Sequence, residues 1–190
     1  GMSLQSLLSG HLKDSSPYIT AFAYGSGVFK QKCRKSEKGN DKMIDYLVVI
    51  DDSEGRMPRW HSHNCKENPS DYSFLGKLMT TRMNIFSDRS VYYVPDVRMK
   101  DGKRIKYGVL GWNQLIGDLF TWDSLFLAGR LHKPTVRLEG SSFNEEYSRP
   151  LSIAMEFNYD SALRTALLLT ARHDFRSVLE TIVGLSYLGD

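Results

Sequence analysis

The chain has the length and composition of an ordinary globular protein. It has 190 residues, of which 41% are hydrophobic, 25% charged and 12% aromatic, a balance that excludes wholesale disorder. Its formal charge of +3 is mild. That charge suits an anionic substrate or membrane surface and gives no indication of a nucleic-acid partner. The length is sufficient for one large domain or two small ones.

The termini and the cysteines add little about location. No apolar run approaches the ~20 residues that a membrane-spanning helix needs. The first residues, Gly1-Met2-Ser3, resemble a remnant of expression, so the sequence does not report on a natural targeting segment. Cys33 and Cys65 form no CxxC pair. We therefore expect two reduced thiols rather than a zinc site or a disulfide.

Strands and helices alternate in the first part of the chain, and helices dominate the rest. Runs rich in β-branched and aromatic residues predict strands over 18–24, 43–50, 91–94, 104–110 and 135–138. Apolar residues at helical spacing predict helices over 4–13, 58–68, about 73–86, 113–131, 143–157, 159–169 and 175–187. The polar segment 30–42 is predicted to be a loop, and Asp101-Gly102 a turn.

This order of elements predicts an α+β protein. We expect a mixed sheet flanked by helices over residues 1–112 and a mainly helical second domain over 113–190.

A glycine-rich turn after the first strand is the first candidate for a ligand site. Gly25-Ser26-Gly27 follows the strand at once, and Asp45 opens the next, largely apolar strand. Glycines let the backbone approach a ligand closely, and successive amides in such a turn bind anions. An aspartate beside them can hold a divalent cation next to phosphate groups. The pattern therefore predicts a phosphate site with a metal ligand, although the triplet alone is more often a plain turn.

The arrangement resembles the nucleotidyltransferases of the polymerase-β type, with one departure. That superfamily carries two carboxylates at alternate positions of the strand, whereas Met43 and Leu47 flank Asp45 here. Asp51 lies six residues on, about 20 Å along a straight strand, too far to share a metal ion. The sequence leaves open whether a second ligand comes from elsewhere, with candidates at Asp41, Asp52, Asp96 and Asp101.

A narrower resemblance covers nearly the whole chain. The sequence resembles the mitochondrial translocator assembly and maintenance proteins, which are phosphatidate cytidylyltransferases. The stretches that carry the resemblance are YGSGVFKQ (24–31), IDYLVVIDD (44–52), WHSHNCKENPSDYS (60–73), IKYGVLGWNQLIGDLFTW (105–122), LFLAGRLHKPT (125–135), SALRTALLL (161–169) and TIVGLSYLGD (181–190). The family continues past the last residues seen here, so the resemblance leads us to expect a chain truncated at both ends.

The resemblance implies a reaction and roles for residues. CTP and phosphatidic acid would give CDP-diacylglycerol and pyrophosphate with Mg²⁺. Gly25, Ser26 and Gly27 would hold the triphosphate, Asp45 would bind the metal ion, and Lys106 would reach a phosphate oxygen. A strand lysine that simply points to solvent is the alternative.

Two further groups of residues are weaker candidates. Arg130, His132 and Lys133 either contact the lipid phosphate or complement the dipole at a helix C-terminus. His61, Asn68 and Tyr72 either border the nucleotide or are structural.

The resemblance also implies a place in the cell, and rival functions stay open. The family implies a peripheral protein on the matrix side of the inner mitochondrial membrane, in contact with anionic lipid and contributing to cardiolipin synthesis. The competing hypotheses are a nucleotidyltransferase with another acceptor and a non-catalytic assembly factor. No nucleic-acid partner is expected, and the sequence does not indicate an oligomeric state.

Overall fold

The computed structural model describes residues 3–12, 16–29, 43–82, 91–99, 102–171 and 174–188. The chain divides into two compact units. The first consists of Gly1–Trp112 and Val136–Phe143, and the second of Asn113–Thr135 and Asn144–Asp190. The segment Val136–Phe143 therefore belongs to the first unit. The predicted division into 1–112 and 113–190 placed this segment in the second domain. The described Cys65 is a free thiol, and Cys33 lies outside the described residues.

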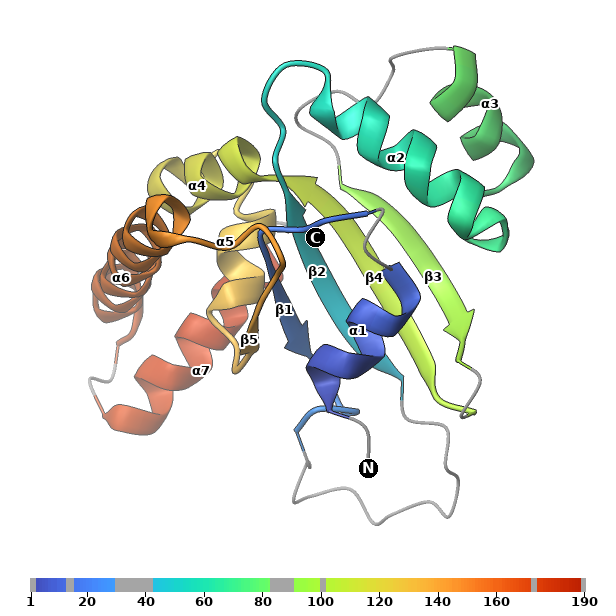
Figure 1. Ribbon diagram of the computed structural model, residues 1–190. Helices are drawn as coiled ribbons and strands as arrows, with labels where there is room; N and C mark the ends of the chain where they lie inside the picture. The colour runs from blue at the N-terminus through green and yellow to red at the C-terminus, as the bar shows by residue number, and fades with distance from the viewer. Residues whose placement is uncertain are drawn as a thin grey trace. The chain divides into compact units, whose positions relative to one another are not determined.

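The first unit is built on a mixed sheet (Figure 1). In the described part of the chain its strands follow the order β3-β4-β2-β1-β5. β2 and β4 are parallel, and the other neighbouring pairs are antiparallel. The strands are β1 (Thr20–Tyr24), β2 (Ile44–Ile50), β3 (Tyr92–Arg98), β4 (Arg104–Gly111) and β5 (Val136–Glu139). The predicted α+β class and all five predicted strands are confirmed.

One face of this sheet carries the main hydrophobic core. Strand side chains alternate between faces, and the alternate residues Tyr46, Val48 and Ile50 of β2 point into this core with Tyr107 of β4. Helices α1 (Leu4–Leu12) and α2 (Arg56–Glu67) cover this face with Leu8, Met57 and Trp60, among others. The residues between these positions, Asp45 of β2 and Lys106 of β4 among them, belong to the opposite face. The short helix η1 (Pro69–Asp71) and helix α3 (Phe74–Arg82) follow α2.

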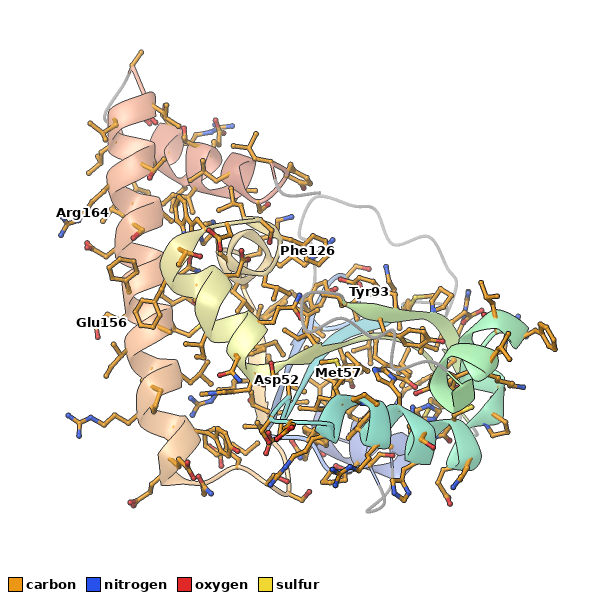
Figure 2. The ribbon with its side chains drawn as sticks, turned by 90° about the horizontal axis from the view of Figure 1, so that it is seen from above. Asp52, Met57, Tyr93, Phe126, Glu156 and Arg164 are labelled. Atoms are coloured by element: carbon orange, nitrogen blue, oxygen red, sulfur yellow. The ribbon has the colours of Figure 1, made fainter. Side chains whose placement is uncertain are left out.

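The second unit is helical. It contains most of α4 (Trp112–Thr121), α5 (Phe126–Leu131), α6 (Glu145–Leu169) and α7 (Phe175–Leu185). Side-chain caps begin the last two helices: Asn144 accepts from the Glu146 amide, and Asp174 accepts from the Ser177 amide. The prediction of two helices over 143–169 was wrong, because α6 runs through that whole segment. Glu156 and Arg164 project outward from α6 in Figure 2.

The predicted continuous helix over 113–131 was also wrong, and Asp118 explains the break. Its buried carboxylate accepts hydrogen bonds from the Leu125, Leu127 and Ala128 amides and from both the amide and the hydroxyl of Ser124. These amides are the orphan donors at the start of α5. The carboxylate therefore begins a new helix, and Leu125 takes a left-handed conformation (φ +57°) at its N-cap.

Candidate functional site

The glycine turn after β1 folds back onto the start of β2. Gly25 has φ +88°, a conformation that favours glycine, and its carbonyl accepts from the Val28 and Phe29 amides. A Cβ on Gly27 would lie 2.5 Å from the Met43 carbonyl oxygen. Both glycines are thus required by the geometry, one for its φ and the other for the close approach of two backbone segments. Ser26 between them is exposed.

Asp45 lies directly beneath this turn. In the sheet it is paired with Tyr24 on one side and Lys106 on the other. A Cβ on Gly25 would fall only 2.6 Å from Asp45 Oδ2. The carboxylate therefore occupies the space that the missing side chain of Gly25 leaves. The sequence predicted that the glycine turn and Asp45 form one site, and the structure brings them into contact.

Lys106 completes this group from β4. It is in register with Asp45 on the neighbouring parallel strand, so the two side chains emerge from the same face of the sheet. Its Nζ lies 5.2 Å from the centroid of the Tyr93 ring on β3. Figure 2 shows Tyr93 on one side of the sheet and Met57 of α2 on the other. One end of the sheet therefore presents a glycine turn, a carboxylate and an ammonium group together.

This group has the parts of a phosphate site that includes a cation. Backbone amides of a glycine turn and a lysine ammonium bind phosphate oxygens. Mg²⁺ is commonly held by one or two carboxylates together with substrate phosphates. The Asp45 carboxylate, set in the space that Gly25 leaves open, fits such an ion. Among the described residues, no group of three or more His, Cys, Asp or Glu side chains could hold a metal without the substrate.

Of the other candidate carboxylates, Asp51 and Asp52 lie away from Asp45, and Asp96 is held in an ion pair. β2 keeps an unbroken register with β4 from Ile44 to Ile50, so Asp51 and Asp52 lie at the opposite end of the strand. Asp51 pairs with Arg56 at 2.5 Å. Asp96 forms an ion pair with Arg104 at 2.9 Å. Asp41 and Asp101 lie outside the described residues.

His61 and Tyr72 lie on the other face of the sheet, in a buried polar network. The Tyr72 hydroxyl is 3.0 Å from His61 Nδ1 and accepts from Asn64 Nδ2 at 3.2 Å. The same Asn64 amide donates to the Tyr107 hydroxyl, which donates in turn to the Asp71 carboxylate. Burial lowers the pKa of His61 to about 4 and raises the pKa values of Tyr72 and Tyr107. These groups are therefore held neutral inside the core.

Asn68 joins the same network at its edge. Its side-chain amide donates to the His11 carbonyl at 3.1 Å and to Asn64 Oδ1 at 2.9 Å. His11 Nε2 lies 2.6 Å from Asp71 Oδ2, so the network ties α1 to α2 and η1. The structure does not bring His61, Asn68 or Tyr72 to Asp45. Their placement fits the structural alternative rather than contact with a nucleotide.

The basic residues predicted to contact lipid belong to the second unit. Arg130 lies over the ring of Phe126 with its Cζ 4.6 Å from the centroid, and Lys133 Nζ lies 4.0 Å from the centroid of Tyr187. His132 Nε2 is 3.1 Å from Asn158 Oδ1, and burial lowers the pKa of His132. His132 is therefore a neutral structural group near pH 7. Arg130 and Lys133 are half-buried.

Tyr93 and Gly108 are the members of the site that the sequence did not reveal. They face each other across β3 and β4, and this register becomes visible only when the sheet forms. Neither a tyrosine in one strand nor a glycine in the next indicates a functional site when each is considered alone.

The fold and the site define a class: an α+β protein in which a glycine turn lies against a carboxylate near the start of a strand, an arrangement suited to phosphate. The comparison with known proteins gives the family. The family model described as mitochondrial phosphatidate cytidylyltransferase matches residues 6–190. The chain therefore belongs to the mitochondrial phosphatidate cytidylyltransferase family, and the resemblance seen in the sequence is confirmed.

Individual relatives agree with this assignment. The mitochondrial phosphatidate cytidylyltransferase of Homo sapiens is 39% identical over 175 residues, which are 90% of this chain and 36% of the human protein. The Mus musculus protein of the same name is 37% identical over 195 residues, covering 100% of this chain and 53% of the mouse protein. The Schizosaccharomyces pombe protein of the same name is 38% identical over 178 residues, covering 92% of this chain and 42% of the yeast protein. The chain thus spans between about a third and a half of these relatives.

Proposed function

We propose that this chain transfers the cytidylyl group of CTP to phosphatidic acid, giving CDP-diacylglycerol and pyrophosphate. The observation that carries the proposal is the meeting of the Gly25 turn, Asp45 and Lys106 at one end of the sheet. Membership of the family selects CTP and phosphatidate among the anionic substrates that such a site suits.

The proposed chemistry needs positioning more than proton transfer. A phosphate oxygen of phosphatidic acid attacks the α-phosphorus of CTP, the new O–P bond forms, and the bond from the α-phosphorus to the bridging oxygen breaks to release pyrophosphate. The ionised lipid phosphate is already a nucleophile, so catalysis rests on alignment and on neutralising charge. The turn amides and Ser26 hold triphosphate oxygens, and the Lys106 ammonium stabilises charge on the leaving group.

Asp45 is the residue that would hold Mg²⁺ in this proposal. The bound ion would neutralise charge on the triphosphate. Asp45 itself keeps a hard anionic oxygen next to the turn. Since no group of three or more His, Cys, Asp or Glu side chains among the described residues could hold a metal ion, the nucleotide phosphates would supply further ligands.

The lipid substrate places the proposed reaction at a membrane. The relatives are named as mitochondrial proteins, which supports a mitochondrial location. A peripheral position on the matrix side of the inner membrane and a role before cardiolipin synthesis are further parts of the proposal. Within the described residues, no helix is both long and apolar enough to span a bilayer. Arg130 and Lys133 are the residues we assign to the phosphates of anionic lipid, from their positive charge and incomplete burial.

Product formation tests the proposal directly. The chain is incubated with CTP, Mg²⁺ and vesicles containing phosphatidic acid, and both pyrophosphate and CDP-diacylglycerol are measured. Asp45→Asn should lower both rates by about 100-fold, since one catalytic charge is removed. Asp51→Asn, at the opposite end of the same strand, should stay within about twofold. Nucleotide binding without transfer to lipid would favour another acceptor, and neither binding nor transfer would favour an assembly factor.

A further inference from the structure

The side chain of Tyr93 packs against a glycine of the neighbouring strand. It is in register with Gly108 in the antiparallel pair of β3 and β4. A Cβ on Gly108 would lie 2.7 Å from Tyr93 Cε1 and 3.1 Å from Cδ1. These separations are shorter than carbon–carbon contact allows. The ring edge that carries Cδ1 and Cε1 therefore lies against Gly108, in a space that any larger residue at position 108 would fill.

This placement puts the ring beside Lys106. Lys106 precedes Gly108 by two residues, so both face the same side of β4. The ammonium lies over the ring, 5.2 Å from its centroid, within the range of a cation–π interaction. Tyr93 is half-buried, as is Lys106. The interaction is therefore partly shielded from water, where such contacts are stronger.

We propose that Tyr93 is a positioning residue, which holds the Lys106 ammonium ready for the triphosphate of the nucleotide. The inference rests on the proposed function for the identity of the anion. A lysine side chain has four rotatable bonds, so fixing it when the ligand binds costs conformational entropy and weakens binding. A lysine that is already fixed in the free protein avoids this cost. The neighbouring carboxylate at the same register is Asp45. The Tyr93 ring face therefore holds the Lys106 ammonium on the face of the sheet from which the Asp45 side chain also emerges.

Gly108 has a part in the same arrangement. It is the absence of a side chain there that lets the ring reach the lysine. Replacing Gly108 with alanine would push the ring away from β4, because the new methyl group also meets Val91 Cγ1 at 2.9 Å. The tyrosine would remain in the sequence, but it would no longer lie under the ammonium.

Two variants at position 93 separate the ring from the rest of the side chain. Tyr93→Phe keeps the aromatic face and loses the hydroxyl, whereas Tyr93→Leu keeps apolar bulk and loses the face. The ε-methylene protons of Lys106, assigned by NMR in the full chain, report the geometry through the ring-current shift. The upfield shift should persist in Tyr93→Phe and vanish in Tyr93→Leu and in Gly108→Ala.

Calorimetry with CTP and Mg²⁺ then measures the consequence. Tyr93→Leu should weaken binding about threefold to tenfold, the size of a partly shielded cation–π contact. Tyr93→Phe should bind within about twofold of the parent chain, because phenylalanine retains the ring face. Weakening of Tyr93→Phe equal to that of Tyr93→Leu, or no upfield shift in the parent chain, would overturn the positioning role.

Lys106→Met distinguishes this inference from the proposed function. If Lys106→Met weakens CTP binding and Tyr93→Leu does not, the nucleotide site stands and the positioning role is overturned. If Lys106→Met leaves CTP binding unchanged, the role of Lys106 in the proposed function fails, and the inference fails with it.

Discussion

Replacing Gly25 with alanine should have two effects. The backbone becomes strained, and the new methyl group displaces the Asp45 carboxylate, which lowers the affinity for CTP. The residue has φ +88°, and an L-residue with a side chain pays about 1–2 kcal/mol in the left-handed region. The methyl carbon would also fall 2.6 Å from Asp45 Oδ2, so the carboxylate has to move. We expect Gly25→Ala to lose about 1–2 kcal/mol of unfolding free energy and at least tenfold in affinity for CTP with Mg²⁺.

The chain offers a matched control at Gly102. That residue has φ +81°, and a Cβ there would meet nothing within 4 Å. Gly102→Ala should therefore cause similar backbone strain with no change in CTP affinity. Urea unfolding measures the first effect and calorimetry the second. Equal losses of affinity in the two variants, or full affinity in Gly25→Ala, would refute the reasoning that the absent side chain of Gly25 makes room for the Asp45 carboxylate.

Further predictions concern stability and its dependence on pH. Asp118→Ala should cost about 3 kcal/mol in urea unfolding, because it strands the buried amides at the start of α5. Asp160→Ala, which removes an exposed ion pair with Arg164 on α6, should cost less than about 0.5 kcal/mol, and equal costs would contradict the capping role of Asp118. Burial lowers the pKa of His61 from its ordinary 6.5 to about 4, so the unfolded chain binds the proton more tightly. Stability should therefore fall as the pH drops from about 6.5 towards 4, and His61→Gln should lessen that fall by roughly 2–3 kcal/mol. Parallel pH profiles of the two chains would contradict a neutral, buried His61.

The strands and the centre of the site were predictable because their signals are local. Runs such as YITAFAY and MIDYLVVI predict strands from composition alone. The glycine turn follows one strand directly and Asp45 opens the next, so an antiparallel pair was enough to bring them together. The placement of Lys106 beside Asp45 required only that β4 pair with β2.

Features set by tertiary contacts were not predictable from the same signals. Helical spacing runs through residues 113–131, yet the Asp118 carboxylate accepts hydrogen bonds from amides at the start of α5, so a second helix begins there. The side chains of His61 and Tyr72 could contact a nucleotide or form hydrogen bonds inside a core. Only the folded structure shows that they are buried on the core face of the sheet. The contact of Tyr93 with Gly108 depends on strand register, which composition does not encode.

Nucleotide selectivity tests the central claim most directly. Calorimetry in the presence of Mg²⁺ compares CTP, ATP, GTP and UTP on the parent chain and on Asp45→Asn. The proposed function predicts that CTP binds more tightly than the other three, and that Asp45→Asn weakens this binding strongly while the fold is retained. Failure of a folded chain to bind any nucleotide, or equal CTP affinity in Asp45→Asn, would contradict the assignment of the nucleotide site to this end of the sheet.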